Sequence, residues 1–331
     1  MGMLYTTDTI WVLLFGKNLN YLMKPLRANE IIGIWGTAML PIQENEAIHW
    51  RLLDEEIAVL MAAGLHGIYT NGTAGEFHNQ SEAEFDVLSE KVAAAAELKG
   101  IPFQLGCGHP LPLAALERVK RAKTLHPGAL QIILPDWVVP NQLELFRYME
   151  KIALEADPVG LVIYNPPHAK KRLSPEDYRG LLSEGFPIVG CKTAGGDESW
   201  YDKMKALPQP FSHFIPGHLL VTGMQRGAKG SYSNIACLHP KAALKWYRMI
   251  QENSSEAKKW EDMLGLFFRE AIFPLIQEEG YSDTAVDKFL AAIGGWADIG
   301  TRLRWPYQGV PVALANEKRK QLEGILPEFF Q

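Results

Sequence analysis

The stretch PIVGCKTAGGD (187–197) runs as a short apolar segment up to a single basic residue, Lys192, and then continues with small and polar residues. A short apolar run of this kind, followed by glycine, is typical of a buried strand that ends in a turn. The same pattern recurs along the chain, so this stretch is one member of a series. The length of the series decides the fold.

Eight β-type runs, each followed by a longer segment of helical period, lie between residues 31 and 236. They occupy 31–40, 67–72, 102–108, 129–135, 160–165, 187–192, 211–215 and 230–236. Eight strand–helix units over about 220 residues match the count and size of a (β/α)8 barrel. The main alternative, a doubly wound sheet, usually has a glycine-rich dinucleotide turn after its first strand. Here that position reads GTAMLPIQEN (36–45), without such a turn.

The intervening segments carry helix-start signals. We predict helices at 44–64, 81–100 and 174–182, the second with a capping box formed by Ser81 and Glu84. We divide the chain into an N-terminal extension (1–28), a (β/α)8 barrel (29–250) and a C-terminal helical region (251–331). The first 22 residues fit no later pattern and are treated as a tag, an extension or an upstream start.

Composition narrows the function classes. The 331 residues are 47% hydrophobic and 21% charged, with a net charge of −5. This balance favours neither a nucleic-acid nor a membrane partner. The three cysteines, Cys107, Cys191 and Cys237, lack metal-ligand spacing. Their sparse, odd number is typical of a reducing compartment, and we predict the cytoplasm.

Barrel chemistry lies at the carboxyl ends of the strands. Lys192 stands at the end of the sixth predicted strand, and a neutral amine in a partly desolvated barrel mouth can add to a ketone and form a Schiff base. Tyr164 ends the neighbouring strand, about 4.7–4.9 Å away in the sheet, and its phenol can shuttle a proton. The turn NGTAGEF (71–77) presents backbone N–H groups and the Thr73 hydroxyl, which suit a carboxylate or a phosphate.

Each of these features has a simpler interpretation when it is taken alone. Lys192 could be a solvated loop lysine, Tyr164 a rim aromatic, and 71–77 an ordinary turn. Cys191 alternates away from Lys192 and is expected to pack against the helices. We expect Glu76 to cap the helix after the second strand. Together, Lys192, Tyr164 and the glycine-flanked turn favour a single site.

Four segments resemble the pyruvate-dependent class I aldolase superfamily, which includes dihydrodipicolinate synthase and N-acetylneuraminate lyase. GTAGE (72–76) is similar to its GTTGE loop, YNPP (164–167) to its YNxP segment and VGCKTAGGD (189–197) to its lysine strand. GAKGSYSNIACLHP (227–240) is similar to its GAxGxIS segment. The likeness runs from about residue 29 to 307.

The resemblance implies a (β/α)8 barrel with a helical C-terminal extension, assembled as a homotetramer (a dimer of dimers). It implies that Lys192 forms the Schiff base, that Tyr164 relays protons, and that Thr73 and the backbone of Ala74 hold the carboxylate. It also implies that neither a metal nor an organic cofactor is needed. We add Gly72, Tyr232, Trp137 and His218 as candidate substrate-binding residues.

Several departures from the family pattern bear on the substrate. The second loop threonine is Ala74 here, and the tyrosine pair after the fourth strand is replaced by PDWVVP (135–140), with Asp136 and Trp137. A tryptophan cannot relay a proton through a hydroxyl. The arginine that follows YNxP in dihydrodipicolinate synthase aligns with Ala169. Lysine biosynthesis is therefore not the activity that we predict.

Our leading hypothesis is a Schiff-base lyase, either an aldolase or a dehydratase, that acts on pyruvate or a related 2-oxo acid. A deoxy sugar acid would suit the polar residues Asp136, His168 and His218. An alternative is a catalytically weak relative that binds a small 2-oxo acid. A phosphate-binding barrel is a third possibility, but IPGHLLVTG (215–223) offers few of the glycine turns that it requires.

Overall fold

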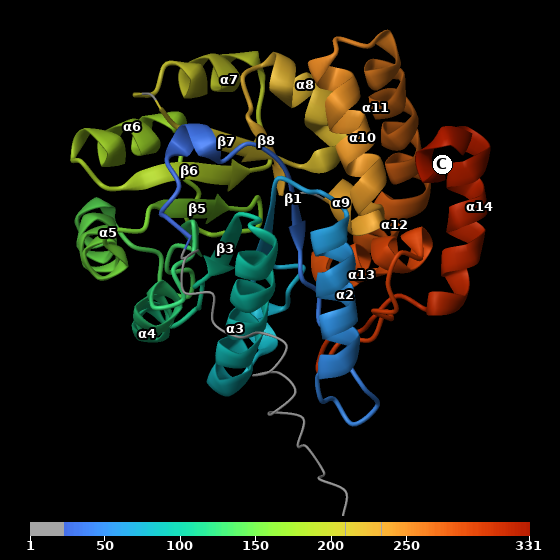
Figure 1. Ribbon diagram of the computed structural model, residues 1–331. Helices are drawn as coiled ribbons and strands as arrows, with labels where there is room; N and C mark the ends of the chain where they lie inside the picture. The colour runs from blue at the N-terminus through green and yellow to red at the C-terminus, as the bar shows by residue number, and fades with distance from the viewer. Residues whose placement is uncertain (1–22, 209, 233) are drawn as a thin grey trace, which may run out of the picture.

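The computed structural model describes residues 23–208, 210–232 and 234–331. Most of the predicted N-terminal extension, residues 1–22, lies outside the described residues. The eight predicted strands are all present and form a closed parallel barrel in the order β1 to β8, with β8 pairing to β1. This confirms the (β/α)8 fold (Figure 1).

Most strands are shorter than the sequence runs that predict them. They span Gly33–Thr37 (β1), Gly67–Thr70 (β2), Phe103–Gly106 (β3), Ala129–Ile132 (β4), Leu161–Asn165 (β5), Ile188–Thr193 (β6), Ser212–Ile215 (β7) and Gly230–Tyr232 (β8). At β8 the difference is one of type, since residues 234–236 of the predicted run belong to a helix. The apolar runs continue past the strands because the first residues of the following loops are also buried.

Helices alternate with the strands and continue after the last one. Within the barrel they are Trp50–Ala62 (α2), Glu82–Lys99 (α3), Pro112–Lys123 (α4), Gln142–Ala156 (α5), Pro175–Ser183 (α6), Glu198–Lys205 (α7) and Leu220–Gln225 (α8). The helices after β8 are Asn234–Leu238 (α9), Pro240–Gln251 (α10), Ser255–Phe267 (α11), Phe273–Gln277 (α12), Asp283–Gly294 (α13) and Ala315–Ile325 (α14). Shorter helical segments are Ala28–Glu30 (η1), Phe77–Asn79 (η2), Gly217–Leu219 (η3), the π-helix Phe268–Ile272 (η4), Val312–Leu314 (η5) and Pro327–Phe330 (η6).

Local side-chain chemistry sets several helix starts. Ser81 accepts from the backbone of Glu84 and Glu84 returns the bond, so the predicted capping box is present at α3. Ser174 caps α6 in the same way. The helix predicted from residue 44 begins only at Trp50, because the chain first forms a turn closed by an Ile42–Ile48 bridge and His49 then caps the helix.

The barrel interior is filled by aromatic side chains, as expected for a packed core without a pore. Trp35, Tyr69, Phe214 and Tyr232 are buried together. The Tyr232 ring stacks on Phe214 with centroids 4.5 Å apart and meets Tyr69 edge-on at 5.0 Å. A larger apolar core joins the outer strand faces to the helices. The aromatic layer forms a rigid floor under the carboxyl ends of the strands.

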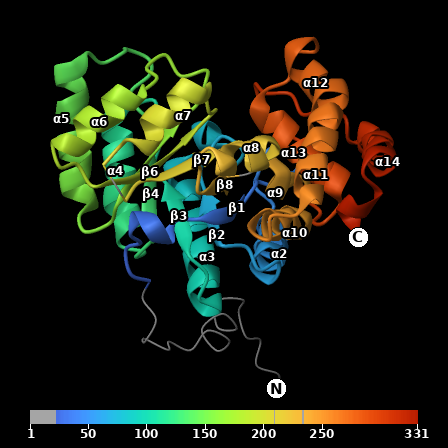
Figure 2. The ribbon, with the colours of Figure 1, turned by 90° about the horizontal axis from the view of Figure 1, so that it is seen from above.

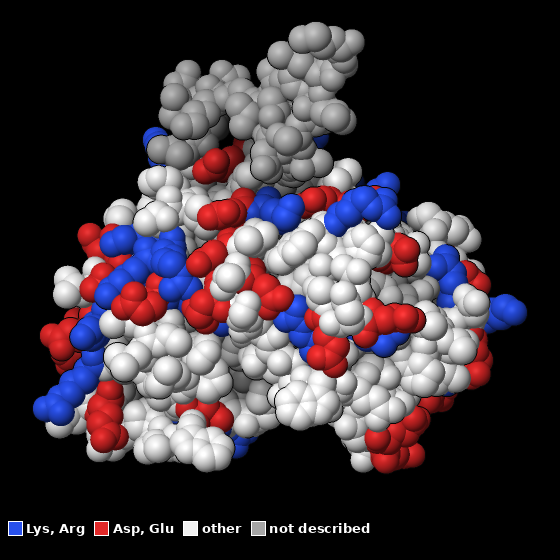
Figure 3. Space-filling model, turned by 90° about the horizontal axis from the view of Figure 1, so that it is seen from below, with Lys and Arg blue, Asp and Glu red and all other residues white. Residues whose placement is uncertain are grey.

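The helices after β8 gather on one side of the barrel, as Figures 1 and 2 show. The face in Figure 3 carries basic and acidic side chains intermixed, without a large area of one sign. In the described part of the chain, no helix is both long and apolar enough to cross a membrane.

Candidate active site

A cavity of about 350 Å³ lies at the carboxyl ends of the strands. One side is formed by residues from or just after β2, β5, β6 and β8, and the other by η3, η4, α12 and α13. Its volume falls at the lower end of the range of small-molecule sites. The C-terminal helices therefore close over the barrel mouth where chemistry is expected.

Lys192 and Tyr164 meet in this cavity. They are register partners on the neighbouring strands β6 and β5, and the Lys192 Nζ atom lies 4.6 Å from the centroid of the Tyr164 ring. The Thr73 Oγ1 atom donates a hydrogen bond to the Tyr164 hydroxyl oxygen over 3.1 Å. The structure thus brings together the three residues that the sequence analysis names as catalytic. It places Lys192 one residue before the end of β6.

The loop that carries Thr73 is fastened to α13. The Thr284 hydroxyl donates to the Thr73 carbonyl oxygen over 3.0 Å. Lys288 forms an ion pair with Glu76 at 2.5 Å, and both side chains are buried. Burial raises the pKa of Glu76 and lowers the pKa of Lys288. The expectation that Glu76 caps a helix is therefore wrong: its carboxylate is paired with Lys288 across the cavity wall.

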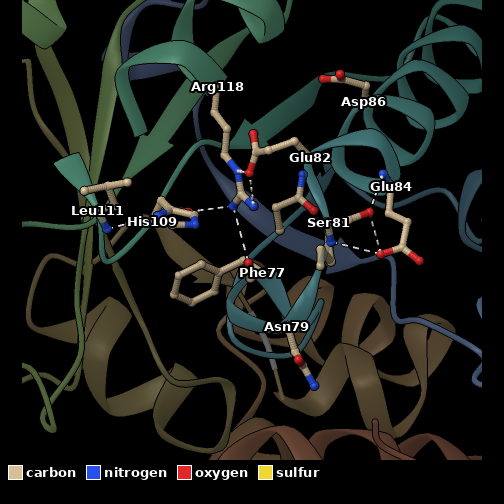
Figure 4. A network of polar contacts seen from close by, with 12 residues as sticks. Phe77, Asn79, Ser81, Glu82, Glu84, Asp86, His109, Leu111 and Arg118 are labelled. Atoms are coloured by element: carbon tan, nitrogen blue, oxygen red, sulfur yellow. Dashed lines mark hydrogen bonds and ion pairs between the residues drawn. The ribbon is translucent and has the colours of Figure 1, made fainter. Parts of the chain in front are cut away.

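A second set of contacts fixes the other end of the same loop. Arg118 of α4 is buried and donates from Nε to Glu82 over 3.0 Å. It also donates to the carbonyl oxygens of Phe77 (3.3 Å) and Gly108 (2.9 Å). Figure 4 shows the guanidinium at the centre of this network. Residues 73–82 are held from two sides, so Thr73 has little freedom to move.

Asp287 is a charged cavity residue that the sequence analysis did not name. It projects from α13 and lines the cavity with Lys192, and it forms no hydrogen bond or ion pair with any other described residue. Burial raises the pKa of Asp287 to about 7, although the nearby Lys192 charge opposes the shift. Asp283, one helical turn earlier, also lines the cavity and lies 3.7 Å from the His168 Nδ1 atom. The sequence gives no sign of which face of α13 meets the barrel.

Three of the predicted substrate-binding residues have roles in packing. Tyr232 lines the cavity floor, but its hydroxyl donates to Gln104 over 2.6 Å inside the barrel. Gly72 lies under the Tyr69 ring, which would stand 2.9 Å from an added Cβ. Ala74 is buried in the turn. Neither Gly72 nor Ala74 contributes a side chain to the cavity lining.

His218 lines the cavity as part of an aromatic group. Its ring stacks on Phe268 with centroids 5.0 Å apart and meets Phe273 edge-on at 5.7 Å. Burial lowers the pKa of His218 to about 4, so the ring is neutral at pH 7. The Asn234 side chain lies 2.9 Å from the His218 Nδ1 atom and fixes its orientation.

Trp137 lies away from the cavity. Its side chain is 83% exposed on the loop after β4, where Lys170 lies 5.1 Å from the ring centroid. Asp136, on the same loop as Trp137, accepts a hydrogen bond from the backbone N–H of Lys170 in the loop after β5. Trp137 is not among the residues that line the cavity of this chain, and its role in substrate binding stays a prediction.

The three cysteines lie in the core, and Cys237 also lines the cavity. Cys107, Cys191 and Cys237 are buried and unpaired. Burial raises the pKa of the Cys191 thiol, which faces the helix layer as alternation predicts. Among the described residues, no group of three or more His, Cys, Asp and Glu side chains is arranged to hold a metal ion.

The sequence is similar to a known protein family and to several of its members. The sequence profile of the dihydrodipicolinate synthetase family matches residues 30–323. An uncharacterised DapA-like lyase of Thermococcus onnurineus is 27% identical over 301 residues, covering 89% of this chain and 99% of that protein. The 4-hydroxy-tetrahydrodipicolinate synthase of Methanospirillum hungatei is 27% identical over 232 residues, or 69% of this chain and 79% of its own length.

Solved structures share the fold. A sialic acid aldolase of Ruminococcus gnavus superimposes with a TM-score of 0.79 at 18% identity, over 91% of this chain and 99% of that one. YagE, an Escherichia coli prophage protein solved in complex with pyruvate, gives a TM-score of 0.77 at 16% identity, over 89% and 98% of the two chains.

Proposed function

Because the chain belongs to the dihydrodipicolinate synthetase family, a family of class I aldolase-type lyases, we propose that Lys192 forms a Schiff base with a 2-oxo acid. The observation that carries this proposal is the grouping of Lys192, Tyr164 and Thr73 in one cavity. A lysine amine adds to the substrate ketone, and loss of water gives a cationic imine. Removal of a proton from C3 then gives the enamine that makes or breaks a carbon–carbon bond.

Tyr164 is positioned to move the protons of these steps. Its hydroxyl accepts a hydrogen bond from Thr73, which orients the phenol toward the cavity. A phenol in this place can give a proton to the leaving hydroxyl group and recover one later. We assign the binding of the substrate carboxylate to Thr73 and to the backbone of Ala74, in the turn after β2.

Asp287 supplies a negative charge on the side of the cavity opposite the strands. In its ionised form it stabilises a positive charge at the Lys192 nitrogen, whether ammonium or imine. An opposing charge in a partly desolvated site has a larger effect than it would have in water. We therefore include Asp287 with Lys192 and Tyr164 in the catalytic group.

Pyruvate is the simplest 2-oxo acid that this site would accept, and YagE, with the same fold, was solved in complex with pyruvate. The finer prediction of a deoxy sugar acid depended on the missing arginine after YNxP and on the polar residues Asp136, His168 and His218. Of these only His218 lines the cavity, and it is neutral and packed between aromatic rings. The three polar residues therefore give little support for a sugar acid.

We also propose that the chain assembles as a homotetramer. Leu111, Trp137 and Val138 are exposed on the loops after the neighbouring strands β3 and β4, and Leu113 is exposed in the first turn of α4. Exposed apolar side chains in adjacent loops are typical of a surface covered by another subunit. Measurement of the mass in solution tests this, and a monomer at micromolar concentration would contradict it.

The test of the catalytic proposal is chemical trapping. The protein is incubated with pyruvate and reduced with borohydride, and the modified peptide is identified by mass spectrometry. We expect a reduced pyruvyl adduct on Lys192 that is absent from Lys192→Ala and retained in Lys170→Ala, which changes a lysine outside the cavity. If no adduct forms with pyruvate or longer 2-oxo acids, the chain is better described as a family member that binds a small ligand without catalysis.

A further inference from the structure

The side of the cavity formed by the C-terminal helices is strongly apolar. Seven aliphatic and aromatic residues line it and are here called the apolar wall: Leu219, Phe268, Ile272, Phe273, Ile276, Val286 and Leu290. Four of them come from η4 and α12, where the chain passes through a π-helical turn. The neutral His218 ring stacks on Phe268 and extends the same surface.

Few polar groups accompany the apolar wall. On the helix side of the cavity the described polar side chains are His218, Asn234, Asp283 and Asp287. His218 and Asn234 are hydrogen-bonded to each other, which leaves the Asn234 Oδ1 atom buried without a partner. Asp283 is half-exposed and lies beside His168, so the remaining buried capacity for hydrogen bonds is the Asn234 Oδ1 atom and the Asp287 carboxyl, which suits about one hydroxyl group.

The charges in the cavity also restrict the partner. Lys192 is the cation among the described lining residues, no arginine is among them, and Asp283 and Asp287 are both acidic. If Lys192 is consumed by the Schiff base, nothing on the helix side compensates a second carboxylate. An anionic partner would be repelled by the two acidic side chains.

We propose that the part of the substrate beyond the 2-oxo acid is an uncharged apolar group, so that the enzyme joins or releases an aliphatic or aromatic aldehyde. This inference rests on the Schiff-base function proposed above. In the condensation, C3 of the enamine attacks the aldehyde carbon, and the aldehyde oxygen takes up a proton. Hydrolysis of the imine then releases a 4-hydroxy-2-oxo acid and restores the Lys192 amine. Cleavage is the same sequence reversed.

Two physical effects favour this partner over a polyhydroxylated one. An apolar substituent loses contact with water against the apolar wall, which is favourable in proportion to the area buried. A sugar chain would bring several hydroxyl groups to a surface without donors or acceptors for them, and each unpaired buried hydroxyl is costly. The single hydroxyl group formed at C4 can be accommodated by Asn234 and Asp287.

The test compares aldehydes of similar size in condensation with pyruvate. Benzaldehyde and 3-methylbutanal represent the apolar class, glyceraldehyde the polyol class and succinic semialdehyde the anionic class. We expect kcat/KM for an apolar aldehyde to exceed that for glyceraldehyde and for succinic semialdehyde by at least tenfold, in line with the discrimination that an apolar pocket provides. A preference for either polar aldehyde, or equal values for all four, would overturn the proposal.

A substitution in the apolar wall tests whether this surface causes the preference for apolar aldehydes. Phe273 is partly exposed in the cavity, so Phe273→Ala removes apolar surface with a limited effect on folding. We expect kcat/KM for the apolar aldehydes to fall at least fivefold while the trapped pyruvate adduct on Lys192 still forms. An unchanged apolar preference in Phe273→Ala counts against the inference. The trapped adduct distinguishes failure of this inference from failure of the proposed function. Absence of the adduct in the wild type would refute the Schiff-base function itself.

Discussion

The Thr73 hydroxyl donates a hydrogen bond to the Tyr164 hydroxyl oxygen over 3.1 Å, although 91 residues separate the two in sequence. The bond joins the loop after β2 to the end of β5, and Lys192 lies against the same tyrosine ring. The bond leaves the phenolic proton free to point toward a substrate, and rotation of the Thr73 hydroxyl can turn its own proton to the substrate carboxylate. The proton relay and the carboxylate-binding turn are therefore mechanically coupled.

The first prediction concerns Tyr164. Tyr164→Phe keeps the ring beside Lys192 but removes the hydroxyl group, so we expect kcat to fall by about 10²–10⁴-fold, the usual contribution of a general acid–base group. Steady-state kinetics with pyruvate and an accepted aldehyde would show this. Tyr148→Phe is the control, because Tyr148 of α5 donates from its hydroxyl to the Ile133 carbonyl oxygen, and neither residue lines the cavity. A kcat for Tyr164→Phe within threefold of the wild type contradicts the relay.

The second prediction concerns Thr73. Thr73→Val preserves the shape of the side chain but removes the hydrogen bond to Tyr164, and Thr73→Ser preserves the bond. We expect Thr73→Val to raise the KM for pyruvate and to lower kcat, each by about tenfold or more, since one hydrogen bond in such a site has an effect of roughly 1–3 kcal/mol. Thr73→Ser should recover most of both values. Equal kinetics for the two variants would mean that the hydroxyl group has no role.

The third prediction follows from the raised pKa of Asp287, which burial moves from its ordinary value to about 7. The folded state then holds a proton that the unfolded state has already released between about pH 4 and 7, so this group lowers the free energy of unfolding as pH rises through that range. Asp287→Asn removes the effect. We expect the variant to be more stable than the wild type above pH 7 by about 1–3 kcal/mol, and little different near pH 4.

Urea denaturation at pH 4.5 and pH 8 measures this difference. The same variant should be a poorer enzyme, since it lacks the charge that faces Lys192. A variant that is less stable than the wild type at pH 8 would show that the Asp287 carboxylate is stabilised by its surroundings, contrary to the pKa direction found here.

The barrel could be predicted from the sequence because each strand is a short β-rich run followed by a turn, and eight such runs fit one fold. The proximity of Lys192 and Tyr164 could also be predicted, because neighbouring parallel strands bring their carboxyl ends together. The roles assigned to them remain predictions. The end of β8 could not be predicted, because apolar residues resume at Ile235 directly after two polar residues, and α9 has already begun at Asn234.

The missed residues share a physical cause. Asp287, Lys288 and Thr284 lie on one helix, and their importance depends on which face of α13 meets the barrel. The orientation of α13 is determined by packing between segments about 200 residues apart in the sequence. A local sequence pattern does not contain this information. Trp137 lies away from the cavity for a related reason: the direction of a loop is decided by its contacts, here with Lys170.

The fourth prediction tests the link between α13 and the Thr73 loop. Lys288→Met leaves the Glu76 carboxylate buried without its partner, and breaking a buried pair in this way usually costs about 3–5 kcal/mol. The double variant Glu76→Gln with Lys288→Met removes both charges, so we expect it to regain part of the lost stability. Urea denaturation at pH 7 measures each. If Lys288→Met were as stable as the wild type, the ion pair would have no structural importance.

The last prediction separates packing from binding at Tyr232, which the sequence analysis proposed as a substrate-binding residue. Its hydroxyl group donates to Gln104 within the barrel, and the ring is held between Phe214 and Tyr69. Tyr232→Phe keeps the ring in place but leaves Gln104 without that donor, so we expect a loss of about 1–3 kcal/mol in unfolding free energy. The KM for pyruvate should change by less than twofold, because the hydroxyl group points away from the cavity. A large rise in KM with unchanged stability would show instead that the phenol turns toward the substrate, and that the hydrogen bond to Gln104 breaks when the site is occupied.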